Sequence, residues 1–184
     1  MNKILIALLM FAALSQSSIA QSTTTAANLK IVLIRHGEKP LVGNNLNCKG
    51  LNRSRLLPAV ITSKFGVPNF VYVPPMTLGN ATLHSRMFQT VIPLVVKYNI
   101  AVNTTHDEHE YNEIAADLKT KTGLILVTWE HKAIPFITKA LGIQLDNLTW
   151  PDDDFDSIWI VTFPNGVPTL TRDKEGLNPS DNCD

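Results

Sequence analysis

The feature that most constrains the fold is a short apolar run at residues 31–34, Ile-Val-Leu-Ile, which is rich in β-branched side chains. Such a run is typical of a strand buried on both faces, as in the parallel sheets of α/β proteins. A second run of this kind lies at residues 124–127. Segments with apolar residues at helical spacing lie at residues 50–63, 85–98, 111–118 and 132–141. Further strands are expected at residues 70–73, 100–102, 158–163 and 168–171, with a turn at 164–166. This alternation predicts a single-domain, three-layer αβα sandwich whose sheet is mostly parallel with an antiparallel edge.

The N-terminal segment has the order of a secretory signal. Lys3 precedes an apolar run at residues 4–14, and a polar stretch then leads to small residues around Ala20. This order predicts a signal peptide at 1–20, a flexible leader at 21–28, and a folded domain at 29–184. The protein is therefore expected to be exported, to the periplasm or the outside; the alternative is a disordered apolar start on a cytoplasmic protein. In an oxidising compartment Cys48 and Cys183 could form a bridge, although sequence spacing alone does not establish that they are close.

Composition excludes several classes of protein. The 184 residues suit one domain. They carry 16 Lys and Arg against 16 Asp and Glu, so there is no general attraction to nucleic acid or anionic lipid. Two cysteines are too few for a disulfide scaffold, and their spacing does not suggest structural zinc. After the predicted signal, no stretch approaches the roughly 20 apolar residues that a membrane span needs.

Reactive side chains follow both of the apolar runs. The first run leads directly into Arg35-His36-Gly37-Glu38, and the second leads through three residues to His131. Because ligands bind beyond the carboxyl ends of parallel strands, the two histidines are expected to share one pocket. Arg35 has the planar fork that suits phosphate oxygens, and Arg86 opens a predicted helix, whose start favours anions. Gly37 is expected to let backbone approach a ligand closely. These residues predict an anion pocket with a nucleophilic imidazole.

Three segments together resemble the histidine phosphatase (phosphoglycerate mutase-like) superfamily. Residues 35–38, Arg-His-Gly-Glu, resemble its signature, and residues 127–131, Val-Thr-Trp-Glu-His, resemble the strand that carries its second histidine. Residues 85–90, Ser-Arg-Met-Phe-Gln-Thr, are similar to its second arginine motif, with the departure that the serine is adjacent to the arginine and His84 precedes it. The resemblance extends over most of the chain after the predicted signal, and it implies a small exported member with a phosphoglycerate mutase-like fold.

The resemblance also implies roles for these residues. His36 would attack phosphorus and become phosphohistidine, which water then hydrolyses. Arg35, Arg86 and His131 would hold the phosphoryl oxygens, so that neither a metal nor another cofactor is required. His131 is expected to act in its protonated form, which favours mildly acidic to neutral pH.

The proton donor for the leaving group is the least determined part. In the family it is a carboxyl after the second-arginine helix or one beside the second histidine. Glu110 is the first choice here and Glu108 the second. Glu130 ranks third, because a strand residue next to His131 is expected to point to the opposite face. Lys132 follows His131, so the His-Asp pair of the phytase-like branch is absent.

The predicted activity is hydrolysis of a small phosphorylated substrate, a phosphomonoester, without nucleic acid or stable membrane insertion. One alternative is a binding module that keeps the anion pocket but lacks turnover. Another is a metal-binding protein that uses His106 and His109 with neighbouring carboxylates. Arg53 is a possible further cation in the pocket, and the acidic residues 152–154 are expected to form a solvated turn.

Overall fold

A computed structural model describes residues 28–77 and 82–183. The predicted signal peptide at 1–20 and nearly all of the predicted leader lie outside these residues. The strands form a six-stranded sheet in the order β3-β2-β4-β1-β5-β6. Their bounds are β1 Leu29–Arg35, β2 Phe70–Tyr72, β3 Val102–Asn103, β4 Gly123–Trp129, β5 Ser157–Thr162 and β6 Thr169–Lys174. The strands β3, β2, β4 and β1 are mutually parallel, whereas β5 and β6 continue the sheet in antiparallel pairings.

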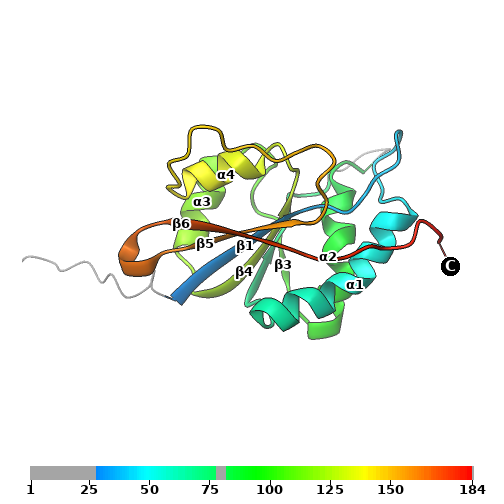
Figure 1. Cartoon of the computed structure of the whole chain (residues 1–184), viewed down its shortest axis with the longest axis horizontal. Coiled ribbons are helices and arrows are strands. Elements are labelled where there is room, and N and C mark those ends of the chain that lie inside the picture. Colours follow the sequence, from blue (N-terminus) through cyan, green and yellow to red (C-terminus); the bar gives the residue numbers. More distant parts are fainter. Residues whose placement is uncertain (1–27, 78–81, 184) are drawn as a thin grey trace, which may run out of the picture.

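Four helices cover the two faces of this sheet, as Figure 1 shows. They are α1 Cys48–Phe65, α2 Ser85–Tyr98, α3 Tyr111–Lys119 and α4 Ile134–Ala140. The pair α1 and α2 lies on one face, and the pair α3 and α4 lies on the other. The three-layer αβα sandwich with an antiparallel edge is therefore confirmed. Helix α1 continues through Pro58, and α4 begins at Ile134, later than its expected start because residues 131–133 form a turn.

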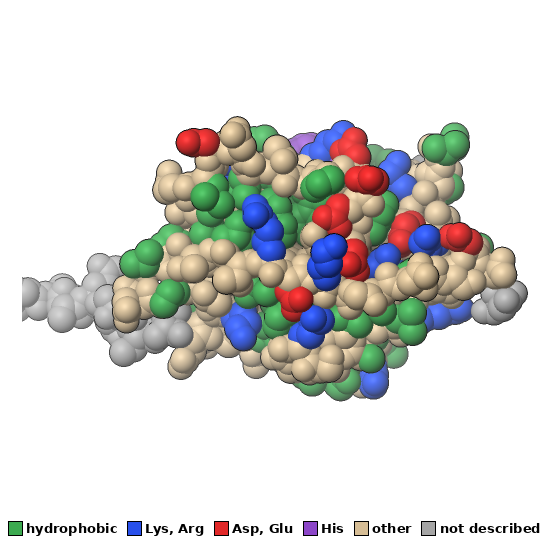
Figure 2. All heavy atoms as spheres, viewed as in Figure 1, with side chains coloured by type: hydrophobic (Ala, Val, Ile, Leu, Met, Phe, Trp, Pro, Cys, Tyr) green, Lys and Arg blue, Asp and Glu red, His purple; other side chains and the backbone are tan. Residues whose placement is uncertain are grey.

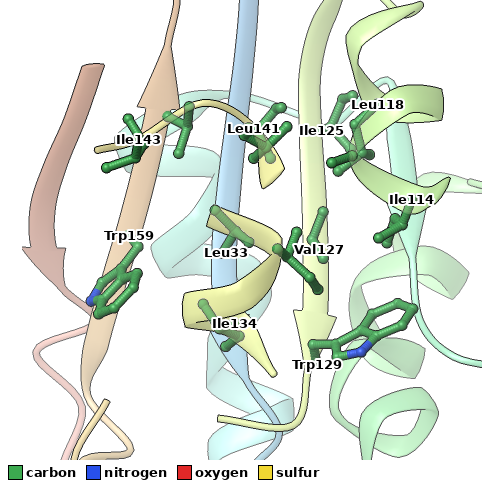
Figure 3. Close-up of a cluster of buried hydrophobic side chains, with 14 of the residues drawn as sticks. Leu33, Ile114, Leu118, Ile125, Val127, Trp129, Ile134, Leu141, Ile143 and Trp159 are labelled. Carbon is green, nitrogen blue, oxygen red and sulfur yellow. The ribbon is translucent and has the colours of Figure 1, made fainter. Parts of the chain in front are cut away.

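The core is divided between the two faces of the sheet. Alternate residues of β1 and β4 enter opposite clusters, with Leu33 and Val127 facing α3 and α4 while Val32 and Leu126 face α1 and α2. This division explains the uninterrupted apolar runs, because both faces of these central strands are covered. Figure 3 shows the first cluster, in which Leu33 and Val127 lie among side chains from α3 and α4.

The pairing of β1 with β4 aligns the ends of these two strands. Their parallel register runs from Leu29 opposite Gly123 to Arg35 opposite Trp129. The backbone N–H of His36 donates to the carbonyl of Trp129 at 3.2 Å, which extends the pairing by one residue. Because both strands end at the same edge of the sheet, the residues that follow them begin side by side.

The C-terminal segment returns across α1. Cys48 and Cys183 form a disulfide, with their Cα atoms 4.8 Å apart, so the bridge that sequence spacing left open is present. The side-chain amide of Asn52 donates to the carbonyls of Ser180 at 3.0 Å and Asn182 at 2.6 Å. This segment therefore holds the start of α1 against the body of the domain.

The described part of the chain contains no helix that is both long and apolar enough to cross a membrane. On the face drawn in Figure 2, acidic and basic side chains are interspersed and do not separate by sign.

Candidate active site

His36 follows β1 directly and is almost fully buried, with 1% of its surface exposed. Its Nδ1 lies 2.7 Å from the carbonyl oxygen of Gly37. A carbonyl only accepts hydrogen bonds, so Nδ1 must carry the hydrogen and the neutral ring keeps its lone pair on Nε2. Burial, reinforced by the positive charges of Arg35, Arg86 and His131, lowers the pKa of His36 to about 3. The imidazole is therefore neutral at physiological pH and has a free nucleophilic nitrogen.

Arg35 is the buried cation beside this imidazole. Its Nη1 donates to the carbonyls of Asp152 at 2.7 Å and Asp154 at 3.2 Å, and its guanidinium carbon lies 3.7 Å from the centre of the Phe155 ring. Burial lowers the pKa of Arg35 to about 10, so the side chain stays charged at neutral pH. Its buried Nε has no hydrogen-bond partner among residues 28–77 and 82–183.

Arg86 comes from the first turn of α2, which is docked onto the turn after His36. The Thr90 hydroxyl accepts the Gly37 N–H at 2.9 Å and donates to the Arg86 carbonyl at 2.7 Å. One guanidinium nitrogen of Arg86 donates to the carbonyl of Gly43 at 3.3 Å. Its Nε is buried and, within the described ranges, has no partner. Arg86 thus brings a second cation with an unused donor to His36.

His131 follows β4, as His36 follows β1, and is 6% exposed. Its Nε2 lies 2.8 Å from a carboxylate oxygen of Asp152. Its Nδ1 lies 2.7 Å from a carboxylate oxygen of Glu130, but this contact lacks hydrogen-bond geometry, and Nδ1 has no hydrogen bond to any described residue. Both ring nitrogens therefore face carboxylates.

The four predicted side chains lie close together in the structure. Their proximity is seen in the pKa of His36, which the positive charges of Arg35, Arg86 and His131 all lower. Three buried nitrogens here lack a partner within the described residues: Nε of Arg35, Nε of Arg86 and Nδ1 of His131. An unsatisfied buried donor costs about 1–3 kcal/mol. A bound oxyanion would supply acceptors to these groups, so the arrangement suits an anion beside a neutral imidazole.

Two neighbouring residues have roles that differ from the expected ones. Gly37 uses its N–H on Thr90, and a Cβ added to it would lie 3.0 Å from the Gly50 carbonyl oxygen, so the close approach is to α1 and not to a ligand. Arg53 does not contribute a free cation, because it pairs with Glu38 at 2.8 Å and with Glu175 in a buried cluster. Both residues position the turn after His36 against α1.

The two preferred candidates for the proton donor, Glu110 and Glu108, differ in their burial and in their contacts. Glu110 is exposed, and its carboxylate accepts the backbone N–H of Asp107 at 2.9 Å within its own loop. Glu108 is partly buried, and one of its carboxylate oxygens lies 2.6 Å from Nε2 of His84, the residue before α2. Burial and contact with the α2 start therefore favour Glu108, the reverse of the expected order.

The ring of His84 and the carboxylate of Glu108 face each other. Nδ1 of His84 lies 3.1 Å from the carbonyl of Pro75, so Nδ1 carries a hydrogen. In a neutral ring Nε2 is then an acceptor that faces a carboxylate oxygen, which is also an acceptor.

Glu130 lies beside His131, contrary to the argument that ranked it third. Strand alternation does not direct its side chain, because β4 ends at Trp129 and the chain turns immediately afterwards. Its second carboxylate oxygen accepts the backbone N–H of Lys132 at 2.6 Å.

Two of the acidic residues 152–154, Asp152 and Asp154, contact the site, whereas Asp153 is exposed as expected of a solvated turn. The backbone of Asp152 and Asp154 holds Arg35, and Asp152 contacts His131. The sequence motifs do not indicate this loop, because residues 152–154 lie outside the three segments that resemble the family. A signal was present in the topology: β5 is antiparallel to β1, so residues just before β5 lie at the edge of the sheet where β1 ends.

Comparison with known proteins bears on the fold of the chain. No protein-family model and no curated protein matches the chain. Among solved structures, the protein histidine phosphatase SixA complexed with tungstate has a TM-score of 0.59 and 18% identity over 80% of this chain and 97% of that one.

Two further solved structures are proteins assigned as phosphohistidine phosphatase SixA. The one from Agrobacterium tumefaciens has a TM-score of 0.53 and 13% identity, covering 78% of this chain and 96% of that chain. The one from Nakamurella multipartitia has a TM-score of 0.52 and 13% identity, covering 78% and 93%. The chain shares the fold of these three solved structures, the phosphoglycerate mutase-like fold expected from the sequence.

Proposed function

We propose that this protein is a phosphomonoester hydrolase that works through a phosphohistidine on His36. The observation that carries the proposal is the neutral, buried imidazole whose Nε2 is free and which is surrounded by cationic groups with unused buried donors. A neutral nitrogen nucleophile and preorganised positive charge are what displacement at phosphorus requires. The similarity to a protein histidine phosphatase complexed with tungstate, a tetrahedral oxyanion, is consistent with this use of the fold.

The reaction has two displacements at phosphorus. In the first, Nε2 of His36 forms a bond to phosphorus while the bond to the leaving oxygen breaks, and that oxygen takes a proton. In the second, water attacks the phosphohistidine, the P–N bond breaks, and phosphate and the free imidazole result. Arg35, Arg86 and His131 hold the phosphoryl oxygens as charge develops, a contribution of several kcal/mol in comparable sites.

We further propose Glu108 as the group that protonates the leaving oxygen. Its carboxylate is partly buried and lies 2.6 Å from Nε2 of His84, directly before the helix that carries Arg86. Its backbone carbonyl accepts the indole N–H of Trp129 at 2.9 Å, which ties this loop to the end of β4. A carboxyl held at the start of the helix that carries Arg86 is a suitable candidate for the general acid.

Export is also part of the proposal. The disulfide between Cys48 and Cys183 supports an oxidising compartment, where such bridges persist. The periplasm and the extracellular space are both consistent with this observation.

Trapping of the phosphoenzyme tests the proposed function. Purified protein is incubated with ³²P-labelled phosphodonor, quenched in alkali, and probed for acid-labile label; hydrolysis of p-nitrophenyl phosphate is measured in parallel. The wild type is expected to take up label, and His36→Ala to lose label and at least about 10³-fold in turnover. His109→Ala is the matched control, because His109 is exposed and its ring contacts Tyr111, outside the proposed site.

The non-catalytic alternative gives a different outcome. A binding module would bind phosphate or vanadate in the wild type yet show neither label nor hydrolysis, and that result would overturn the proposed function. The metal-binding alternative gains no support from the geometry. His106 pairs with Asp117, and the described residues contain no group of three or more His, Cys, Asp or Glu that could hold a metal ion.

A further inference from the structure

Asp152 makes a contact that the phosphatase mechanism does not use. Its side chain is 80% exposed, yet one carboxylate oxygen lies 2.8 Å from Nε2 of the buried His131. Asp152 lies 21 residues after His131, on the loop between α4 and β5. The hydrogen bond from His131 is the largest cause of the lowered pKa of Asp152, so the carboxyl is ionised at neutral pH.

The loop that carries Asp152 is held rigidly from several sides. Its backbone accepts hydrogen bonds from Arg35, and the ring of Phe155 stacks on that guanidinium. The carboxylate of Asp154 accepts the N–H groups of Asp156 and Ser157 at 3.0 and 2.9 Å and the Ser157 hydroxyl at 2.6 Å. Asp152 is therefore presented to His131 by a preorganised turn, although its own side chain is open to solvent.

The chemistry of this contact determines where His131 keeps its hydrogens. An ionised carboxylate only accepts, so Nε2 must carry a hydrogen. In the neutral ring Nδ1 would then hold the lone pair and could not donate to a phosphoryl oxygen. Nδ1 becomes a donor only when the ring is an imidazolium, and Nδ1 is the buried nitrogen that lacks a hydrogen bond within the described residues.

We infer that Asp152 is a positioning residue for phosphoryl transfer, which accepts the Nε2–H of His131 and stabilises the charged ring so that Nδ1–H donates to the transferred phosphoryl group. This inference rests on the proposed function. A carboxylate in contact with an imidazolium favours its charged form, and outer-shell carboxylates of this kind orient histidines in other sites.

Several charged groups surround His131 and enter the expected pH dependence. Glu130 faces Nδ1 and favours the charged ring, as Asp152 does at Nε2. The other charged or titratable groups at this site are Arg35 and His36 at the end of β1, Arg86 on α2 and the adjacent Lys132. Removal of one carboxylate from this balance should therefore shift the pH range in which the ring is charged toward acid.

The test compares Asp152→Asn with Asp153→Asn. Asparagine keeps the shape and an acceptor oxygen but removes the charge. Asp153 is the matched control, because it is the exposed neighbour with the same charge and makes no hydrogen bond or ion pair to the described residues. For Asp152→Asn, kcat for p-nitrophenyl phosphate is expected to fall about 10- to 100-fold at pH 7.5, with a much smaller loss near pH 5.5. The alkaline limb should move to lower pH by about one unit, whereas Asp153→Asn should stay within about twofold of the wild type at all pH values.

The outcomes separate this inference from the proposed function. If the wild type forms no phosphohistidine and hydrolyses no phosphomonoester, both fail. If the wild type is active and Asp152→Asn loses the same factor at every pH, or equals Asp153→Asn, only the role of Asp152 is overturned. A second readout does not depend on turnover: ¹⁵N NMR of the His131 ring should show hydrogen on Nε2 up to pH 8 in the wild type. A neutral ring in the wild type with hydrogen on Nδ1 and none on Nε2 would contradict the inference.

Discussion

An imidazole attacks phosphorus only through an unprotonated nitrogen, and His36 is held in that state although its hydrogen bond with the Gly37 carbonyl raises its pKa. Burial opposes a charge on the ring, and two arginines and His131 oppose it further. The Gly37 carbonyl fixes the hydrogen on Nδ1 and leaves Nε2 free. The cations that lower the pKa of His36 would also hold the phosphoryl group, so one arrangement of charge serves both purposes.

At the scale of single residues, the proton donor can be tested by leaving-group dependence. Glu108→Gln is expected to slow hydrolysis of an alkyl phosphate by roughly 10²- to 10⁴-fold, and p-nitrophenyl phosphate much less, because nitrophenolate leaves without protonation. Initial rates for both substrates measure the effect. Glu110→Gln serves as the control and should resemble the wild type, because its carboxylate is exposed and bonded to its own loop.

Equal losses for the two substrates in Glu108→Gln would remove Glu108 from the acid role. A selective loss in Glu110→Gln would return the role to the residue that the sequence favoured.

At the scale of elements, the site depends on adjacent parallel strands. β1 and β4 end in register, with Arg35 opposite Trp129, so His36 and His131 follow from neighbouring ends. Helix α2 adds Arg86 through the bond from Gly37 to Thr90. The antiparallel β5 brings its preceding loop to the same edge. Four elements thus contribute one short segment each, and no single element contains the site.

The C-terminal segment and α1 form a second unit that can be perturbed without touching His36. The Cys48–Cys183 bridge has a sequence separation of 135 residues. The double variant Cys48→Ser/Cys183→Ser is expected to lose about 2–4 kcal/mol in the free energy of unfolding, because the unfolded chain is no longer constrained. Urea denaturation with and without reductant measures this: reductant should destabilise the wild type by a similar amount and leave the variant unaffected. A variant as stable as the oxidised wild type would contradict the expectation.

At the scale of the whole molecule, stability should depend on pH through a buried carboxyl. Burial raises the pKa of Glu175 from 4.5 to about 7, although Arg53 pulls in the opposite direction. The folded state then binds a proton more tightly than the unfolded state. This contribution to stability is full below pH 4.5 and is lost as the pH rises through about 7.

Glu175→Gln should remove that dependence, and urea denaturation between pH 5 and 8 measures it. The difference in unfolding free energy between wild type and variant should change by about 1–3 kcal/mol across this range, with the wild type relatively more stable at low pH. The comparison with the variant is needed because His36 has an opposite effect. Its pKa is lowered from 6.5 to about 3, so its contribution to the free energy of unfolding is lost as the pH falls below 6.5. A difference that is constant with pH, or that has the opposite sign, would contradict the assignment to Glu175.

Local sequence patterns predicted most of the strands and helices and part of the candidate site. The runs at 31–34 and 124–127 are strands buried on both faces, and the helical spacing at 85–98 coincides with α2. Hydrophobic periodicity reports such elements directly, since each residue's burial depends on its own face. The order of strand and reactive residue then placed Arg35, His36 and His131 at one edge of the sheet.

The sequence by itself determined the layers, the order of the main strands and helices, and the identity of the four candidate side chains, although β1 and β4 extend to Arg35 and Trp129, beyond the expected ends at residues 34 and 127. Only the tertiary structure decided that Asp152 contacts His131, that Glu108 is partly buried while Glu110 is not, and that Cys48 meets Cys183. These contacts join loops and termini whose positions are not periodic. They depend on how the elements pack across separations of 21 and 135 residues, and no local pattern encodes that packing.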